Sequence, residues 1–294
     1  MNGLELARGY YNDCARELIL NKFPDQSGRI AAGLVGEGSE CFGFDDEISK
    51  DHDFCPRFFL WLSEEDEKAI GDDLRELYDS LPSSYEGVPR VDTPQTKLRS
   101  GVWQIGSFYD YILRSKGLPE TRSEWLRIPD QCLAAATNGE VFTDPLGEFT
   151  RIREYLSDCP EDVWLTKLSG RLFEMAQSGQ YNYPRTVRRG DTVAQHLAMD
   201  RFISSALMTI LALNRKYSPF YKWLFRAAKE CTILRETVDK IRFLTVSEGD
   251  EAINRIEAIC SDITGELARQ GLTSSHDTFL VAHSDEIAAK LRDR

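Results

Sequence analysis

Residues 35–54 read VGEGSECFGFDDEISKDHDF, and this stretch decides the predicted fold. The apolar run over residues 30–35, with its glycine, predicts a short buried strand that leads into it. Gly38-Ser39 then marks a tight turn, and Asp51-His52-Asp53 follows after eleven intervening residues. A strand, a glycine-serine turn and a pair of carboxylates therefore follow one another at a defined spacing.

Each part of this stretch suits a distinct piece of chemistry. A Gly-Ser turn at the end of a strand offers backbone N–H groups and a hydroxyl that can hold a triphosphate. If Asp51 and Asp53 occupy alternate positions of a strand, both carboxylates lie on one face and suit Mg²⁺, which prefers oxygen ligands. Either pattern alone is common in turns and at solvated strand ends. Together and in this order they favour a phosphate and metal site over coincidence.

The rest of the N-terminal half predicts a mixture of helices and strands. Apolar periodicity and capping residues predict helices over 4–18, 63–81, 107–117 and 129–139, and apolar runs predict strands over 30–35, 54–62, 102–105 and 140–143. Pro56 inside the second of these strands indicates an edge position or a bulge. Residues 83–100 are expected to form an exposed loop.

Strand signals almost vanish after about residue 150. Long helical periods predict helices over 160–177, 192–215, 219–230, 233–270 and 275–292, and the fourth of these has a break near Glu248-Gly249. We therefore expect an α+β fold in two domains. Residues 1–157 would form a small mixed sheet with flanking helices, and residues 158–294 a helical bundle.

The spacing of Gly38-Ser39 and Asp51-His52-Asp53 resembles the signature of the nucleotidyltransferase superfamily, whose members share a polymerase-beta-like fold. The longer string over residues 33–54 is similar to an uncharacterised bacterial family of nucleotidyltransferase-like proteins, still labelled as a domain of unknown function. The helical C-terminal half resembles aminoglycoside-type nucleotidyltransferases in layout. The resemblance implies transfer of a nucleoside monophosphate from an NTP, with ATP expected, to a hydroxyl-type acceptor on a small molecule or macromolecule.

The same resemblance implies a metal cofactor and assigns roles to four residues. Asp51 and Asp53 would be the catalytic carboxylates and the ligands of Mg²⁺, with Mn²⁺ as the alternative metal. Gly38 and Ser39 would bind the nucleotide. The acidic cluster Asp45, Asp46 and Glu47 is interpreted as a solvated loop or cap in preference to a third metal ligand.

Two features depart from the superfamily pattern. The residue between the carboxylates is usually apolar, whereas this chain has His52. The superfamily also uses a third carboxylate on a later strand, where this chain offers Gln104; the nearby acids Asp92, Asp110 and Glu140 are weak substitutes. The alternative function is therefore a catalytically weakened nucleotide-binding sensor or a partner-binding protein.

Two further clusters are candidate nucleotide contacts in the helical half. Arg185, Arg188 and Arg189 fall in a segment that we interpret as a loop, and guanidinium groups suit phosphate oxygens. A solvated loop that pairs with local acids is the alternative interpretation. Lys222 lies in an aromatic run that the resembling family also has, which implies an approach to the nucleotide. A joint between two helices is the alternative there.

Composition limits the partners and the compartment. The chain has 294 residues, 41% hydrophobic and 29% charged, which is typical of a globular protein with a sizeable core. The net charge of −12 repels phosphate backbones and disfavours general nucleic-acid binding. No apolar run approaches the ~20 residues that span a bilayer, and the N-terminus lacks a signal-peptide core. We expect a cytoplasmic protein with no membrane partner.

The seven cysteines are scattered and never form a CxxC pair, which predicts reduced and mostly buried thiols. The expected partners are an NTP and an acceptor whose identity the sequence does not give. A homodimer is compatible with the sequence.

Overall fold

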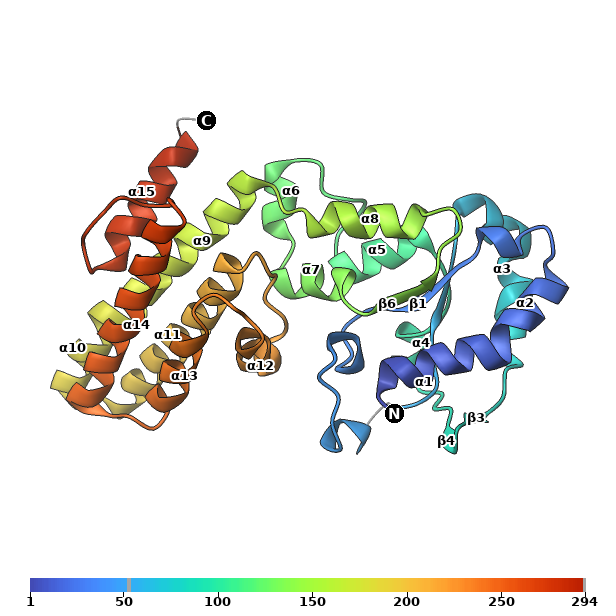
Figure 1. The fold of residues 1–294 in the computed structure, drawn as a ribbon, viewed down its shortest axis with the longest axis horizontal. Coiled ribbons are helices and arrows are strands. Elements are labelled where there is room, and N and C mark those ends of the chain that lie inside the picture. The colour runs from blue at the N-terminus through green and yellow to red at the C-terminus, as the bar shows by residue number, and fades with distance from the viewer. Residues whose placement is uncertain (52–53, 293–294) are drawn as a thin grey trace. The chain divides into compact units, whose positions relative to one another are not determined.

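A computed structural model describes residues 1–51 and 54–292. The chain divides into two compact units, of which the first comprises Met1–Glu120 and Arg127–Asp158. The second unit comprises Thr121–Leu126 and Cys159–Arg294. The fold is α+β as predicted, with a small mixed sheet and flanking helices in the first unit (Figure 1). The described part of the second unit contains helices and no strand.

A four-stranded sheet forms the centre of the first unit, in the order β5-β2-β1-β6. Its strands are β1 (Ala31–Leu34), β2 (Phe59–Leu62), β5 (Gly101–Gln104) and β6 (Glu140–Thr143). β1 is antiparallel to both β2 and β6, whereas β2 and β5 are parallel. β1 and β2 are buried on both faces, which is why they read as continuous apolar runs and not as alternating patterns.

Helices cover both faces of this sheet (Figure 1). They are α1 (Gly3–Tyr10), α2 (Arg16–Lys22), α3 (Glu64–Asp79), α4 (Pro94–Leu98), α5 (Ile105–Leu113), α7 (Asp130–Thr137) and α8 (Glu148–Ser157), and a π-helical turn (Tyr11–Ala15) joins α1 to α2. Leu60 and Leu62 face the core shared with α1, α2 and α3. On the other face Trp61 stacks on Phe149 of α8, with ring centroids 3.8 Å apart. The alternating side chains of β2 thus contribute to two separate apolar layers.

Three predictions for the first unit are wrong in detail. The second strand begins at Phe59 and not at residue 54, because Pro56 has no N–H to give to a ladder, and β2 is a central strand. Residues 83–100 are not a featureless loop, since they contain a hairpin of β3 (Ser84–Tyr85) and β4 (Val88–Pro89) and the short α4. The helix predicted from Ser107 begins at Ile105, and its N-cap is Gln104.

The second unit is a bundle of helices around one apolar core. Its helices are α6 (Arg122–Arg127), whose first five residues lie in this unit, α9 (Glu161–Met175), α10 (Tyr183–Arg189), α11 (Thr192–Leu213), α12 (Leu224–Lys229), α13 (Arg235–Leu244), α14 (Gly249–Arg269) and α15 (Leu280–Arg292). A π-helical segment, Ala176–Asn182, joins α9 to α10 without a break. Among the described helices, α11 alone is long and apolar enough to cross a membrane, and 56% of that window is buried inside the fold. Core helices of soluble proteins share this property.

Candidate functional site

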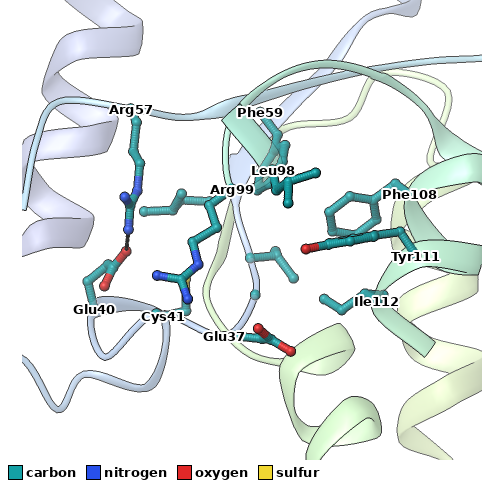
Figure 2. A pocket seen from close by; sticks show the side chains of 14 residues that line it. Glu37, Glu40, Cys41, Arg57, Phe59, Leu98, Arg99, Phe108, Tyr111 and Ile112 are labelled. Carbon is teal, nitrogen blue, oxygen red and sulfur yellow. Dashed lines mark hydrogen bonds and ion pairs between the residues drawn. The ribbon is translucent and has the colours of Figure 1, made fainter. Parts of the chain in front are cut away.

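A pocket opens in the first unit where β1 ends and the Gly-rich turn begins (Figure 2). It encloses about 380 Å³ of space, part of it open to solvent. Its lining residues are Leu34, Val35, Gly36, Glu37, Gly38, Glu40, Cys41, Arg57, Phe59, Leu98, Arg99, Phe108, Tyr111 and Ile112. The pocket is therefore divided between a polar side, with the turn and two arginines, and an apolar aromatic side.

The turn that forms the floor of the pocket is held by a neighbouring loop. The Gly36 N–H donates to Asn138 Oδ1 at 3.0 Å, and Asn138 Nδ2 donates back to the Gly36 carbonyl at 2.7 Å. Gly139 donates its N–H to the Cys41 carbonyl at 2.8 Å. Gly36 has a φ of +143°, a conformation open to glycine but rarely adopted by other residues. The sequence predicts Asn138-Gly139 only as the end of a helix. In the structure these two residues also hold the Gly36–Gly38 turn in place.

Two arginines reach the pocket from the segments that lead into the adjacent strands β2 and β5. The parallel pairing of β2 and β5 places Phe59 opposite Gly101. Arg57 and Arg99 each stand two residues before that pair, so the sheet register brings them to the same edge of the sheet. Figure 2 shows both side chains extending toward the segment that carries Glu37, Glu40 and Cys41. Sequence reasoning missed both residues, because neither has a partner at a recognisable spacing.

Arg57 is almost fully buried, with 5% of its surface exposed, and it remains charged. Its Nη2 lies 2.5 Å from Glu40 Oε1. Burial by itself would lower the pKa of Arg57, but the charge of the Glu40 carboxylate and its hydrogen bond to Arg57 oppose this effect, and the pKa is raised. The pocket therefore holds a permanent cation.

Cys41 lines the same pocket as a neutral thiol. Burial raises the pKa of the Cys41 thiol well above its usual range, and the Glu40 charge raises it further, against smaller opposing effects of Arg57 and Arg99. A thiol in this state is a poor nucleophile. The described cysteines are all free and mostly buried, as predicted.

The turn residues predicted from the sequence behave differently from one another. Gly38 lines the pocket, whereas Ser39 does not. Ser39 instead begins the 3₁₀ turn Glu40–Phe42, where its carbonyl accepts from the N–H groups of Phe42 and Phe44 at 3.1 and 2.9 Å. Ser39 therefore shapes the segment in which Glu40 and Cys41 lie.

Asp51, the first of the two predicted metal ligands, is not on a strand. Asp51 is the last residue of a 3₁₀ turn, Ile48–Asp51, and the strand starts only at Phe59, after the bend at Cys55-Pro56. Asp53 and His52 lie outside the described residues. The shared-face geometry expected for alternate strand positions does not apply to Asp51, because a 3₁₀ turn has a period close to three. The assignment of Asp51 and Asp53 as metal ligands stays a prediction.

The acidic loop before Asp51 has local partners. Asp45 Oδ2 accepts from the N–H of Gly3 at 2.7 Å, at the positive end of α1. Asp46 accepts from both the backbone N–H and the hydroxyl of Ser49 at 2.9 Å. These two acids serve as caps, in agreement with the interpretation made from the sequence.

The candidates for a third carboxylate are engaged elsewhere. Gln104 Oε1 accepts from the Ser107 N–H at 2.6 Å and caps α5. Asp110 Oδ1 accepts from the Gly117 N–H at 2.7 Å, and Glu140 pairs with Arg8 at 2.8 Å. Within residues 1–51 and 54–292, no three His, Cys, Asp or Glu side chains cluster closely enough to hold a metal ion.

The predicted arginine loop is a helix. Arg185, Arg188 and Arg189 lie on α10, which continues from the π-helical segment Ala176–Asn182 and has Pro184 in its first turn. Arg185 stacks on the ring of Tyr181 with its guanidinium carbon 4.7 Å from the centroid, and Nη1 donates to the Tyr181 hydroxyl at 3.1 Å. Arg188 and Arg189 are exposed.

Lys222 lies in a 3₁₀ turn, Tyr221–Trp223, with Nζ 4.9 Å from the centre of the Trp223 ring. Like the three arginines of α10, Lys222 belongs to the second unit, whereas every residue that lines the pocket belongs to the first. Nucleotide binding by these four residues stays a prediction.

Comparison with known proteins gives two similarities. A family model described as "Domain of unknown function (DUF4037)" matches residues 125–224, a segment that contains none of the pocket-lining residues. Among solved structures, the chain is similar to a nucleotidyltransferase-like protein from Exiguobacterium sibiricum 255-15, with 11% identity and a TM-score of 0.41. That similarity covers 95% of this chain and 80% of the other. No curated protein matches the chain.

Proposed function

We propose that this protein is a nucleotidyltransferase that moves a nucleoside monophosphate from an NTP to a hydroxyl-type acceptor. The observation that carries the proposal is the pocket at the end of β1, where the Gly36–Gly38 turn meets Arg57 and Arg99. Support also comes from the sequence, in which Asp51 and Asp53 follow that turn at the spacing of the superfamily signature. ATP is the proposed NTP.

The two sides of the pocket suit the two ends of a nucleotide. Backbone N–H groups of a glycine turn and guanidinium groups bind phosphate oxygens through charge-assisted hydrogen bonds. Phe108 and Tyr111 supply an aromatic wall against which a planar base can pack. In this proposal Arg57 and Arg99 hold the β- and γ-phosphates and leave the α-phosphate toward the carboxylates.

Mg²⁺, or Mn²⁺ in its place, would be held by Asp51 and Asp53. Their chemistry fits a hard cation, and two carboxylates alone leave most coordination positions for water and nucleotide oxygens. When bound, the metal neutralises charge that develops on the transferred phosphoryl group. The protein's own contribution is to fix the triphosphate with its arginines and turn, so that an acceptor hydroxyl meets the α-phosphate in line.

One observation favours the alternative of a nucleotide-binding sensor. Gln104, at the position expected for a third carboxylate, caps α5 with its own side chain and cannot act as a base. A site with only two acids would bind Mg·NTP and transfer its nucleotide slowly or not at all.

Pyrophosphate release decides between the two functions. The protein is incubated with Mg²⁺, each of the four common NTPs and a metabolite extract, and mass spectrometry follows acceptors that gain a nucleoside monophosphate. A transferase releases pyrophosphate in proportion to the labelled product, and the Asp53→Asn variant does not. Binding of Mg·NTP without any pyrophosphate or product would identify the sensor and reject the transferase.

A further inference from the structure

The carboxylate of Glu40 occupies the polar side of the pocket. It pairs with the buried Arg57 at 2.5 Å, and only 13% of the Glu40 side chain is exposed. A guanidinium in such a buried position needs an anionic partner, because an uncompensated charge there is strongly unfavourable. Glu40 is an anionic partner of Arg57.

The same carboxylate also lies against the glycine turn. A Cβ atom placed on Gly38 would lie 2.5 Å from both Cδ and Oε2 of Glu40, which no real side chain permits. Figure 2 shows the Glu40 side chain directed toward Arg57, with the ion pair drawn as a dashed line. The Glu40 carboxylate therefore lies beside the glycine turn and pairs with the guanidinium, and a phosphate bound in the pocket would meet the same two groups.

The base of the Glu40 side chain packs against the start of α1. A Cβ placed on Gly3 would lie 2.5 Å from Cβ of Glu40, so α1 packs directly on the first carbon of the side chain. Glu40 itself lies in the single 3₁₀ turn Glu40–Phe42. Rotation about the outer side-chain bonds can move the carboxylate off Arg57 without moving the turn.

We propose that the Glu40 carboxylate is an internal substitute for the phosphate of a ligand: it pairs with Arg57, and a polyphosphate that binds in the pocket displaces it. The proposal rests on the proposed function in that it takes a phosphate as the group that binds there. Displacement lets Arg57 exchange one carboxylate for a more highly charged phosphate, so the buried cation is compensated in both states. Glu40 thereby lowers the affinity for polyphosphates and rejects weaker anions.

Removing the charge of Glu40 tests this proposal. Glu40→Gln keeps the shape of the side chain but removes the carboxylate that pairs with Arg57, so phosphate no longer competes with that carboxylate for the guanidinium. We expect inorganic tripolyphosphate, titrated calorimetrically without metal, to bind the variant about 10- to 100-fold more tightly than the natural protein, the size of one charge-assisted contact. The melting temperature of the variant without ligand should fall, and tripolyphosphate should restore it.

Glu67→Gln is the matched control, because Glu67 pairs with Arg75 on α3 in the same unit and away from the pocket. Its tripolyphosphate affinity should stay within about threefold of the natural protein. If Glu40→Gln does not fold, Glu40→Asp provides the second variant, since its shorter carboxylate retracts from Arg57 and should tighten binding to a smaller degree.

Equal or weaker tripolyphosphate binding by the Glu40 variants would overturn the proposal and show that Glu40 organises the pocket for its ligand. Absence of binding in every form would overturn it as well. Tripolyphosphate has no nucleoside, so the result is independent of nucleotidyl transfer. Tighter binding by Glu40→Gln in a protein that never releases pyrophosphate would uphold this inference and reject the transferase.

Discussion

Gly139 holds the turn of the candidate site through its backbone. Its φ is +66°, and a Cβ atom there would collide with the Leu34 carbonyl at the end of β1. We expect Gly139→Ala to destabilise the first unit by about 3 kcal/mol or more, because left-handed strain adds to a steric clash with backbone. Urea unfolding measures the difference.

Gly117→Ala separates the two causes. Gly117 has a similar φ of +71°, but no atom lies within 4 Å of its Cβ position. Gly117→Ala should therefore lower the free energy of unfolding by only about 1–2 kcal/mol, the strain of a left-handed residue. Equal costs for the two variants would show that the approach of Gly139 to Leu34 is unimportant.

The residues of the pocket were predictable only in part. Gly38 is predictable because a glycine-serine pair directly after an apolar run predicts a tight turn at the end of a strand. Arg57 and Arg99 are not, because 41 residues separate them and only the β2–β5 register brings them together. Arginines this far apart carry no local pattern, so a correct strand pairing would have been needed to find them.

At the scale of elements, the π-helical segment Ala176–Asn182 explains one wrong prediction. The sequence QYNYPRTVRRGD predicts a loop because it contains a proline and a glycine, yet residues 176–189 continue the helix. The π-helical segment accommodates one extra residue per turn, and Gly179 packs against the Phe202 ring of α11. Such tertiary packing outweighs local propensity and cannot be read from the segment alone.

Gly179 and Gly170 should respond in opposite ways to alanine. A Cβ at Gly179 would collide with the Phe202 ring, so Gly179→Ala should destabilise the second unit by about 1–3 kcal/mol. Gly170 is exposed on α9 with no atom within 4 Å, so Gly170→Ala should stabilise it by up to about 1 kcal/mol. Thermal unfolding of the two variants measures both changes in stability. Destabilisation by both variants would contradict the different surroundings of Gly179 and Gly170.

The three arginines of α10 remain candidates for nucleotide contact. If they hold the triphosphate, Arg188→Ala should weaken NTP binding by about 1.5–3 kcal/mol and leave the melting temperature without ligand unchanged, because Arg188 is exposed. Calorimetric titration with Mg·ATP measures the affinity. Unchanged affinity in single alanine variants of Arg185, Arg188 and Arg189 would leave α10 as a solvated helix.

The contribution of Tyr10, the last residue of α1, to the stability of the fold depends on pH. Burial raises its pKa from 10.0 to about 12, and its hydroxyl donates to the Pro82 carbonyl at 2.8 Å. Because the unfolded chain loses this proton first, the contribution of Tyr10 to stability is complete below pH 10 and is lost as pH rises toward 12. Tyr10→Phe should be less stable by about 1 kcal/mol at pH 8, since the hydrogen bond is lost.

The difference in free energy of unfolding between the natural protein and Tyr10→Phe should then shrink between pH 10 and 12, because the variant has no phenol to titrate. Urea unfolding at several pH values gives the difference directly. A difference that stays constant over this range would show that Tyr10 does not titrate differently in the folded and unfolded states.

At the scale of the whole molecule, the acidic charge lies in one unit. The first unit has 29 acidic and 16 basic residues, a net charge of −13, and the second has a net charge of +1. A free NTP is repelled by such a unit, whereas a divalent cation is attracted to it and lowers the charge of the nucleotide. We therefore expect a polyphosphate without metal to bind the first unit weakly, and a divalent cation to strengthen the binding of a nucleotide.

The most direct test of this site is a set of melting curves for the natural protein and Asp53→Asn, each with no ligand, Mg²⁺, NTP or both. The natural protein should gain stability only with both, by about 2.7 kcal/mol when Mg·NTP is at 100 times its Kd. Asp53→Asn should melt at the same or a slightly higher temperature without ligand, since two close carboxylates repel, and it should show no Mg·NTP shift. A variant that is less stable without ligand yet keeps the full Mg·NTP shift would contradict Asp53 as a metal ligand.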